Sequence, residues 1–479
     1  MSLSSTGALR REVVGIDARA PRLDGSEQPY VFLDNAASTP AFRSVLRAVE
    51  EFLPWYSAVH RGSGFKSAVA TEVFDRCHDL VARFVGADPA TNMVVFGKNT
   101  TECINKLANR FGFSRDDLVV TTTMEHHSNL LPWRKHARVL HVGVDAEGYP
   151  DLAALRQMLA DHRGRVKLVA ITGASNITGI CPPVHDVAAW AHEAGARIFV
   201  DAAQLAPHRP IDVRPDGDPG HLDFIAFSAH KMYAPFGVGA LVGPVSFFER
   251  GDPDMVGGGV VDVVTLDEVV WNESRHKEEA GSPNVIGGVA LAAAIGVLNE
   301  VGMDAVAAHE QTLLEHAYVR LRHLAGVRLY GPTERMADKV GVVPFTLDGL
   351  PHGLVAAILA TEGGIGVRSG FFCAQPYVKG LLGIDASAKG AGCGVSAALA
   401  TEAGSGMIRA SFGCYTSRDE VDALVDMLER ITRGEYEGRY ESDATGAFRP
   451  EGFTPPIERY YSLGDTTTPT LRPELPEPS

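Results

Sequence analysis

The chain has 479 residues, too many for one compact core and enough for two packed domains with extensions. Its 45% apolar and 22% charged residues are ordinary values for a soluble globular protein. The net charge of −15 argues against a nucleic-acid partner or an anionic membrane surface, and no apolar run is long enough to span a bilayer.

The cysteines show no pattern of a disulfide framework or a metal site. They lie at positions 77, 103, 181, 373, 393 and 414, without Cys-x-x-Cys or Cys/His spacing. The N-terminus lacks the basic and then apolar pattern of a signal peptide. We therefore expect a reducing, cytoplasmic environment.

The N-terminal region leads into two predicted helices. Residues 1–30 are polar and are expected to form an irregular arm, and Val31–Leu33 is a short predicted strand. The first helix has an apolar face at 3–4 residue spacing, formed by Val45, Leu46, Val49, Phe52 and Leu53. The second helix spans Ser67–Val85 and places Cys77 in its apolar stripe. Between them, Trp55–Gly64 is a loop that carries His60 and Arg61 and is either functional or an ordinary surface loop.

A strand, turn and helix follow at Met93–Phe111. Thr100 and Thr101 come after a glycine at the predicted helix start, where backbone N–H groups and the helix dipole favour an anion. An ordinary threonine N-cap is the alternative. The pair of threonines favours a phosphate site.

Three further predicted strands end in polar residues. Leu118–Thr123 runs into a segment with His126 and its neighbouring histidine, Val166–Thr172 leads to Asn176, and Ala196–Val200 leads to Asp201 and Gln204. Helices separate these strands. This alternation is typical of a doubly wound sheet, whose ligand crevice lies at the carboxyl ends of the strands.

The segment Asp223–Lys231 has the strongest chemical pattern. Phe224–Phe227 is an apolar run typical of a strand covered on both faces, and Ser228, His230 and Lys231 follow directly. A poorly hydrated lysine loses its proton more readily, as Schiff-base chemistry requires. On this segment alone, a strand end with a solvated lysine is an equal alternative.

The C-terminal part predicts a second, smaller domain. Helices Val285–Glu300 and Val306–Leu324 lead into an α+β unit that contains the segment around Cys373, a strand Met407–Phe412 with Arg409, and a final helix. Lys379–Gly406 is rich in Gly, Ala and Ser and is expected to be a mobile loop. The predicted divisions are an arm at 1–30, a large cofactor-binding domain at 31–300, a small domain at 301–433 and a polar, proline-rich tail at 434–479.

A phosphate seat, a strand-end aspartate, a Schiff-base lysine and a stacking histidine together would hold pyridoxal 5′-phosphate (PLP). Their order resembles that of the class V aminotransferase family, which has PLP fold type I, and within it the group II cysteine desulfurase/selenocysteine lyase branch. The resemblance covers roughly residues 31–431. It rests on Leu-Asp-Asn-Ala-Ala-Ser, Val-His-Arg-Gly, Thr-Thr-Glu, Met-Glu-His-His, Asn-Ile-Thr-Gly, Asp-Ala-Ala-Gln, Ser-Ala-His-Lys, Gly-Ser-Pro-Asn, the Cys373 segment and Ile-Arg-Ala-Ser.

The resemblance implies an α/β fold with a mostly parallel seven-stranded sheet sandwiched by helices. It also implies that Lys231 bonds to the cofactor, Asp201 pairs with the pyridinium nitrogen, His126 stacks on the ring, and Gln204 and Asn176 lie near the phenolic oxygen. The implied phosphate contacts are Thr100, Thr101, Ser228 and His230, with Ser282 reaching the site of a neighbouring subunit in a homodimer. The implied residues for a small amino-acid substrate are Arg409, Arg368, His60, Asn35 and Asn176.

Cys373 determines the expected reaction. In the desulfurase branch, the cysteine at this position takes the sulfur of L-cysteine as a persulfide, alanine leaves, and an acceptor protein can receive the sulfur. Here Phe372 replaces the histidine that usually precedes this cysteine, and Phe371 adds a second ring, which disfavours a thiolate. A PLP-dependent C–S β-lyase, another class V aminotransferase or an epimerase acting on a bulkier substrate therefore stays open. A sulfur-relay or scaffold subunit is the alternative from a different class.

Overall fold

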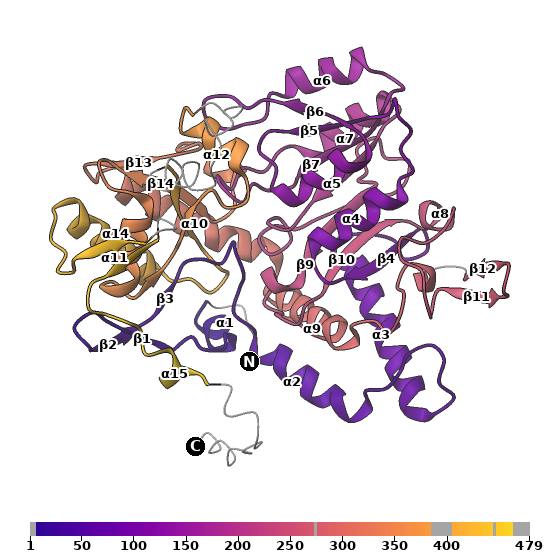
Figure 1. Ribbon diagram of the computed structural model, residues 1–479, viewed down its shortest axis with the longest axis horizontal. Coiled ribbons are helices and arrows are strands. Elements are labelled where there is room, and N and C mark those ends of the chain that lie inside the picture. Colours follow the sequence, from indigo (N-terminus) through magenta and orange to yellow (C-terminus); the bar gives the residue numbers. More distant parts are fainter. Residues whose placement is uncertain (1–5, 273–274, 385–404, 444–446, 463–479) are drawn as a thin grey trace.

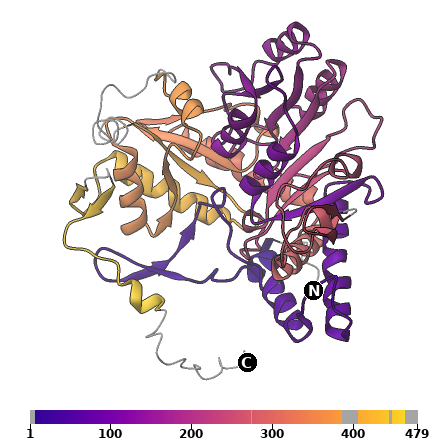
Figure 2. The ribbon, with the colours of Figure 1, turned by 45° about the vertical axis from the view of Figure 1, so that its right-hand side comes forward.

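The computed structural model describes residues 6–272, 275–384, 405–443 and 447–462. It contains a large central sheet covered by helices and a smaller sheet built from the C-terminal part of the chain. The two units lie side by side in both views, and the N-terminal strands run along the smaller one (Figures 1 and 2).

The large sheet has seven strands in the order β4-β10-β9-β8-β7-β5-β6. Only β10 runs antiparallel to its neighbours, β4 and β9, and the remaining pairs are parallel. The predicted mostly parallel, seven-stranded sheet is confirmed. The bounds are β4 (Asn92–Gly97), β5 (Leu118–Thr122), β6 (Arg138–Val142), β7 (Val166–Thr172), β8 (Arg197–Asp201), β9 (Phe224–Ser228) and β10 (Gly239–Pro244).

Alternate residues of these strands belong to two separate cores. In β9, Ile225 and Phe227 pack into one core, whereas Phe224 and Ala226 pack into the other. The first core includes α2 (Arg43–Phe52), α3 (Phe65–Phe84), α6 (Leu152–Asp161), α7 (Val184–Glu193) and α9 (Val285–Val301). The second includes α4 (Thr100–Arg110), α5 (Leu131–His136) and α8 (Val245–Phe248). Because both faces are covered, the strands are near-continuous apolar runs.

The N-terminal residues are more ordered than the sequence predicts. Residues 6–32 form α1 (Thr6–Glu12), β1 (Arg19–Pro21), β2 (Glu27–Pro29) and β3 (Val31–Phe32). Leu9 and Val13 are buried. The expectation of an irregular arm is therefore wrong, because a few apolar residues in a polar segment are enough to anchor it.

The smaller sheet has the order β13-β14-β17-β16 and is antiparallel throughout. Its strands are β13 (Val327–Leu329), β14 (Val342–Leu347), β16 (Arg368–Gly370) and β17 (Met407–Ser411), and its helices are α10 (Met303–Leu321), α11 (His352–Thr361), α12 (Gln375–Leu381) and α14 (Arg418–Thr432). The short β15 (Ile365–Gly366) pairs in parallel with β3. Thus the predicted large domain, residues 31–300, begins with β3, which pairs with a strand of the C-terminal part of the chain.

Two short hairpins and one short helix lie outside the two main sheets. The hairpin β11 (Val261–Val264) and β12 (Val269–Trp271) projects from the large unit (Figure 1). The tail contains β18 (Tyr440–Ser442), β19 (Phe448–Pro450) and α15 (Ile457–Tyr460).

In the described residues, no single helix is long and apolar enough to span a membrane. The pair α9 and α10 together has the length and composition of a span, but the two helices are bent by 74° relative to each other.

Two local predictions need correction. Leu46 and Leu53 were expected on the apolar face near α2, but both are exposed, because Leu53 lies beyond the helix in a short 3₁₀ turn and Leu46 faces away from the core. The predicted loop Lys379–Gly406 begins inside α12, and residues 385–404 lie outside the described part. Cys77 is buried in the α3 core as predicted.

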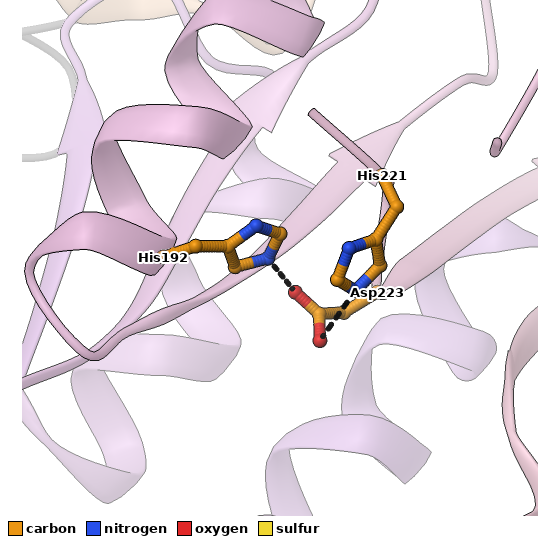
Figure 3. A group of neighbouring side chains, drawn as sticks. All are labelled: His192, His221 and Asp223. Carbon is orange, nitrogen blue, oxygen red and sulfur yellow. Dashed lines mark hydrogen bonds and ion pairs between the residues drawn. The ribbon is translucent and has the colours of Figure 1, made fainter. Parts of the chain in front are cut away.

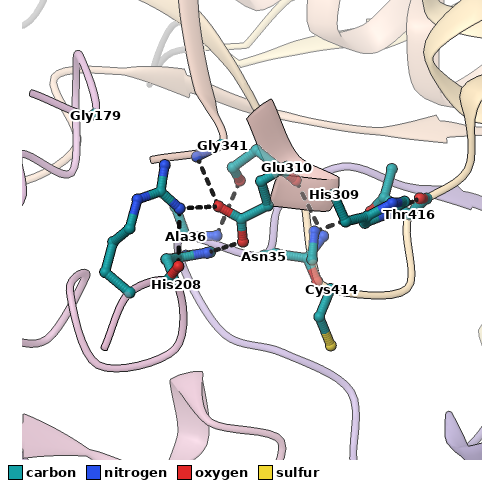
Figure 4. Close-up of polar contacts among 12 residues, drawn as sticks. Asn35, Ala36, Gly179, His208, His309, Glu310, Gly341, Cys414 and Thr416 are labelled. Carbon is teal, nitrogen blue, oxygen red and sulfur yellow. Dashed lines mark hydrogen bonds and ion pairs between the residues drawn. The ribbon is translucent and has the colours of Figure 1, made fainter. Parts of the chain in front are cut away.

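A buried carboxylate joins α10 to the large unit. Glu310 accepts hydrogen bonds from His208, from Arg209 at 3.2 Å and from the backbone N–H of Gly341 at 3.2 Å (Figure 4). Glu310 is completely buried. Glu310 thus meets two basic side chains, His208 and Arg209, and their attraction offsets the free-energy cost of removing these groups from water. The cluster also fixes the position of α10, which carries Glu310.

Lys339 lies near this cluster but has no acidic partner among the described residues. Its side chain is fully buried, and its ammonium group donates only to the Tyr318 hydroxyl and, at 3.4 Å, to the Pro332 carbonyl. Burial lowers the pKa of Lys339 from 10.5 to about 7. The unfolded chain therefore binds more protons than the folded chain between these two pH values, and stability rises with pH across that window.

Replacing Lys339 by methionine is expected to raise Tm by about 2–5 °C at pH 7, since the variant no longer loses a proton on folding. The difference should shrink as the pH rises toward 10, because deprotonating the lysine of the unfolded chain, whose pKa is 10.5, then costs less free energy. Thermal unfolding of both proteins from pH 6 to 10 measures it. Lys106→Met is the matched control, because the Lys106 ammonium lies 3.5 Å from Asp254 and its removal should lower Tm. A gain for Lys339→Met that does not change with pH would contradict this account.

Candidate active site

The carboxyl ends of five strands of the large sheet converge on one cavity of about 210 Å³. Twelve of the fifteen predicted site residues line it: Thr100, Thr101, His126, Asn176, Asp201, Gln204, Ser228, His230, Lys231, Arg368, Cys373 and Arg409. The other lining residues include Asn99, Ser128, Thr172 and Phe372. Strand ends that are far apart in sequence thus place acidic, basic and nucleophilic groups around one space.

Lys231 lies in the 3₁₀ turn η3 (Ala229–Lys231) that follows β9. This turn is fixed to the segment before α2, because the His230 carbonyl accepts hydrogen bonds from Thr39 N at 2.9 Å and from Ser38 Oγ at 3.0 Å. Burial lowers the pKa of the Lys231 amine to about 8, and Asp201 acts in the opposite direction. An amine with this pKa has about 300 times more neutral form at pH 7 than an ordinary lysine.

Asp201 and Gln204 occupy the end of β8. Asp201 Oδ1 accepts a hydrogen bond from Ala203 N at 3.0 Å, and burial raises the pKa of this carboxyl group. Gln204 donates its amide N–H to the Ala36 carbonyl, while its Oε1 atom is buried and has no hydrogen-bond partner among the described residues. A buried polar atom without a partner at a cavity wall is expected where a polar ligand binds.

His126 is held as a neutral imidazole beside the cavity. Its Nδ1 accepts a hydrogen bond from Ser128 N at 3.1 Å, which places the ring proton on Nε2. Burial and the nearby Lys231 lower the pKa of His126 to about 3. Behind it, the Glu125 carboxyl group accepts from Thr122 Oγ1 at 2.6 Å and from Asn129 Nδ2 at 2.7 Å, and burial raises its pKa to about 8.

Hydroxyl groups from three segments cluster at the start of α4. Thr100 Oγ1 lies 2.6 Å from Ser228 Oγ, and Thr101 Oγ1 lies 2.7 Å from Ser128 Oγ. The N-cap of α4 is Asn99, whose side chain accepts from Glu102 N, so neither threonine is the cap. Since the cap is provided by another residue, both threonine side chains are available at the helix N-terminus, where an anion is stabilised.

A buried guanidinium group forms the opposite wall. Arg409 donates to the Asn176 carbonyl at 2.9 Å and to Asp34 Oδ1 at 3.0 Å, and its Nε has no hydrogen-bond partner among the described residues. Arg368 lies 3.3 Å from the other Asp34 oxygen. Asp34 therefore orients both arginines, and Arg409 keeps donors for a carboxylate ligand.

Cys373 lies on a tight turn whose two central residues have positive φ. Phe372 has φ of 50° and Cys373 of 56°, and Ala374 N donates to the Phe371 carbonyl at 2.9 Å. Asn176 Nδ2 donates to the Phe372 carbonyl at 2.9 Å, and His127 N donates to the Cys373 carbonyl at 2.7 Å. Non-glycine residues in this region cost roughly 1 kcal/mol or more each. These hydrogen bonds to the large unit hold the exposed thiol at the cavity.

The Phe372 side chain covers part of Arg409. The guanidinium carbon of Arg409 lies 5.0 Å from the centre of the Phe372 ring. A cation above a ring face is stabilised electrostatically. The aromatic substitution noted in the sequence thus contacts the buried guanidinium group at the cavity wall.

Three predicted residues do not line this cavity. The Asn35 amide is buried and bonded to the Ser411 carbonyl at 3.0 Å and to the Tyr415 hydroxyl at 2.9 Å. His60 and Ser282 line a second cavity of about 540 Å³. There, His60 Nε2 lies 3.1 Å from Asp75 Oδ1.

Three residues around the site were not identified from the sequence. Asp34 and Glu125 lie within the quoted motifs, and Ser128 follows one of them directly, but the sequence assigns no role to any of the three. Adjacency to His126 was an available signal for Ser128 and Glu125. By contrast, the contact of Asp34 with Arg409 joins residues 375 positions apart, which no local pattern reveals.

The comparisons with known proteins agree on one relationship. The family model described as Aminotransferase class-V matches residues 31–424. A cysteine desulfurase of Haloferax volcanii is 37% identical over 430 residues, covering 88% of this chain and 94% of that protein. A probable cysteine desulfurase of Streptomyces coelicolor is 36% identical, covering 90% and 97%.

Solved structures give the same result. An apo structure of a cysteine desulfurase from Thermococcus onnurineus NA1 has a TM-score of 0.77 and 32% identity, covering 89% of this chain and 98% of that one. A cysteine desulfurase from Escherichia coli, in an S-sulfonic acid form, has a TM-score of 0.73 and 29% identity, covering 90% and 98%.

Proposed function

Because this chain belongs to the class V aminotransferase family, we propose that it is a PLP-dependent cysteine desulfurase that releases alanine from L-cysteine and retains the sulfur on Cys373. The observation that carries this proposal is that Cys373, Lys231 and Arg409 line the same cavity. A nucleophilic thiol, a base and a carboxylate-binding group are the parts that the reaction requires.

The donor set of the cavity fits PLP. We propose that Thr100, Thr101, Ser228 and His230 hold the phosphate, that Asp201 faces the ring nitrogen, and that the His126 ring covers one face. The unpartnered Gln204 Oε1 and the neighbouring Asn176 provide polar groups for the phenolic oxygen. Lys231 would attach the cofactor covalently, and the bound cofactor would withdraw electrons from the substrate Cα.

Lys231 and Cys373 then have separate roles. The Lys231 amine, with its pKa lowered to about 8 by burial, accepts the proton from the substrate Cα. Cys373 Sγ attacks the substrate sulfur, so that an S–S bond forms while the Cβ–S bond breaks. The electron pair of that bond stays on the substrate carbon, which is protonated to give alanine. The products are alanine and a Cys373 persulfide, whose outer sulfur can pass to an acceptor protein.

Arg409 would bind the substrate carboxylate. Its planar group already uses one N–H for Asp34 and one for Asn176, and these two bonds fix its orientation. The remaining donors can form paired hydrogen bonds with two oxygens. Arg368, which is half-exposed beside Asp34, adds positive charge at the same wall.

A homodimer with shared sites would explain the second cavity. Ser282 and His60 lie together there, away from the first cavity of the same chain. We propose that the Ser282 hydroxyl reaches the phosphate in a second copy of the chain, as the family resemblance implies.

A PLP-dependent C–S β-lyase acting on a bulkier substrate is the second candidate function. Its support is the Phe372 ring, which lies 5.0 Å from the Arg409 guanidinium and makes the wall beside Cys373 apolar. Such a wall suits an S-alkyl side chain better than a free thiol, and elimination does not need Cys373.

The two functions differ in their products. Purified enzyme loaded with PLP is incubated with L-cysteine and with S-alkyl cysteines, and sulfide, alanine and pyruvate are quantified. Desulfuration gives alanine equal to the sulfur released and no pyruvate. Pyruvate and ammonia in place of alanine would overturn the desulfurase proposal in favour of elimination.

A further inference from the structure

Two histidines and an aspartate converge at the other end of β9, away from the candidate active site. His192 lies in the last turn of α7, His221 precedes β9 by a few residues, and Asp223 lies directly before Phe224. Figure 3 shows both imidazole rings directed at the Asp223 carboxylate. His192 Nε2 lies 2.8 Å from Asp223 Oδ2, and His221 Nε2 lies 3.6 Å from Asp223 Oδ1.

The backbone fixes the tautomer of both rings. His192 Nδ1 lies 2.8 Å from the Pro219 carbonyl oxygen, and His221 Nδ1 lies 2.9 Å from the Asp218 carbonyl oxygen. A carbonyl oxygen only accepts hydrogen bonds, so both Nδ1 atoms carry a proton. If the imidazole is neutral, its Nε2 carries no hydrogen and directs a lone pair at the carboxylate. The carboxylate oxygens also have only lone pairs, so no hydrogen bond can form between the two groups.

This arrangement requires positive charge between the Nε2 atoms and the carboxylate. One way to supply it is a proton on each ring, but the two rings are stacked with centroids 4.3 Å apart, so their charges would repel. Arg197, whose Nη1 lies 4.0 Å from Asp223 Oδ1, would add a third cation. The 3.6 Å separation at His221 is also longer than a hydrogen bond.

One divalent ion satisfies all three groups at once. The ligand atoms of His192, His221 and Asp223 lie within 4.8 Å of one another, and ligands of a tetrahedral zinc ion lie about 3.4 Å apart. A zinc-bound histidine usually donates its second ring N–H to a backbone carbonyl or carboxylate, as both rings do here. The Asp223 carboxylate is itself oriented by Ile198 N at 2.9 Å.

We propose that His192, His221 and Asp223 bind a divalent transition metal of the zinc class, with water as the fourth ligand. Two imidazole nitrogens and one carboxylate favour this class over magnesium or calcium, which prefer oxygen ligands. The ion links the end of α7, the loop before β9 and the start of β9. The site is structural, since five strand residues separate Asp223 from the catalytic end of β9.

Metal content tests this assignment directly. Full-length enzyme loaded with PLP is stripped with a chelator, dialysed and titrated with Zn²⁺, and bound metal and Tm are measured. We expect one equivalent to bind and Tm to rise by at least about 2 °C. With Co²⁺ as the probe, visible absorption of a four-coordinate ion should appear at the same stoichiometry.

Variants locate the bound ion. His221→Gln and His192→Gln should each lose that equivalent and the rise in Tm. His185→Gln is the matched control, because His185 Nδ1 also bonds to this loop, at 2.7 Å from the Gly220 carbonyl, but its ring is not part of the cluster. Any metal bound at Cys373 would be present in the same amount in the wild type and in every variant, so it cancels when their metal contents are compared. Zinc that binds His221→Gln as it binds wild type, or that leaves the wild-type Tm unchanged, overturns the proposal.

Discussion

Lys231→Ala is expected to reduce alanine formation from L-cysteine by about 10³-fold or more, because the variant loses both the covalent attachment of the cofactor and the base that accepts the Cα proton. Lys231 is half-buried at the cavity, and a lowered pKa of about 8 makes its amine effective in both roles. An ordinary solvated lysine would be almost fully protonated at neutral pH.

Borohydride treatment separates the loss of attachment from a failure to fold. In wild type, reduction should link the cofactor irreversibly to the peptide that contains Lys231, which mass spectrometry detects. The variant should bind PLP without this linkage and keep a Tm near that of wild type. Lys98→Ala, which removes a lysine before α4 that does not line the cavity, should behave as wild type. A Lys231→Ala enzyme with unchanged turnover would refute the assignment of this residue.

Cys373→Ala is expected to lower sulfur release from L-cysteine by about 10³-fold or more, while cofactor binding stays intact. The thiol is the group proposed to attack the substrate sulfur, and the described cavity contains no second cysteine. Wild type treated with substrate and then with a thiol-alkylating reagent should carry one additional sulfur at Cys373, visible as a 32 Da mass increase, which is about the mass of one sulfur atom.

Cys181→Ala is the matched control for this substitution. Cys181 lies in the large unit and does not line the cavity, and burial raises its thiol pKa to about 12, so it is not a nucleophile at neutral pH. Its removal should leave sulfur release unchanged. If Cys373→Ala instead keeps its rate and pyruvate is the product, the enzyme eliminates the thiol and the β-lyase is the correct function.

The sequence predicted the features that depend on neighbouring residues. The run Phe224–Phe227 followed by polar groups correctly indicated a strand buried on both faces, because burial and strand termination are local, and the polar groups after it line the cavity. The strand ends indicated candidates such as His126, Asp201 and Lys231, and the family resemblance added others, such as Cys373 and Arg409. Twelve of the fifteen residues predicted in these two ways line one cavity. The same reasoning left a poorly hydrated and a solvated Lys231 as equal alternatives, and the lowered pKa of this lysine in the structure favours the first.

Features that depend on distant pairing could not be predicted in this way. The orientation of Arg409 by Asp34 and the capture of the Phe372 carbonyl by Asn176 join segments about 200 to 375 residues apart. The positive φ angles at Phe372 and Cys373 are also not evident from the sequence, because both residue types normally avoid this conformation and hydrogen bonds from distant residues help to maintain it. The exposure of Leu46 and Leu53 shows that helical spacing alone does not define which apolar residues are covered.

The pairing of β3 with β15 has a consequence for synthesis on the ribosome. Leu33 N donates to the Gly366 carbonyl at 2.8 Å, so the strand that begins near Val31 has no partner until more than 330 further residues have been translated. At about 5–20 residues per second, this delay lasts roughly 20–70 seconds. Asp34 emerges with the same strand and meets Arg409 later still. The helices and strands of the large sheet can form during this interval, whereas the cavity wall that contains Asp34 and Arg409 is completed only after Arg409 has been translated.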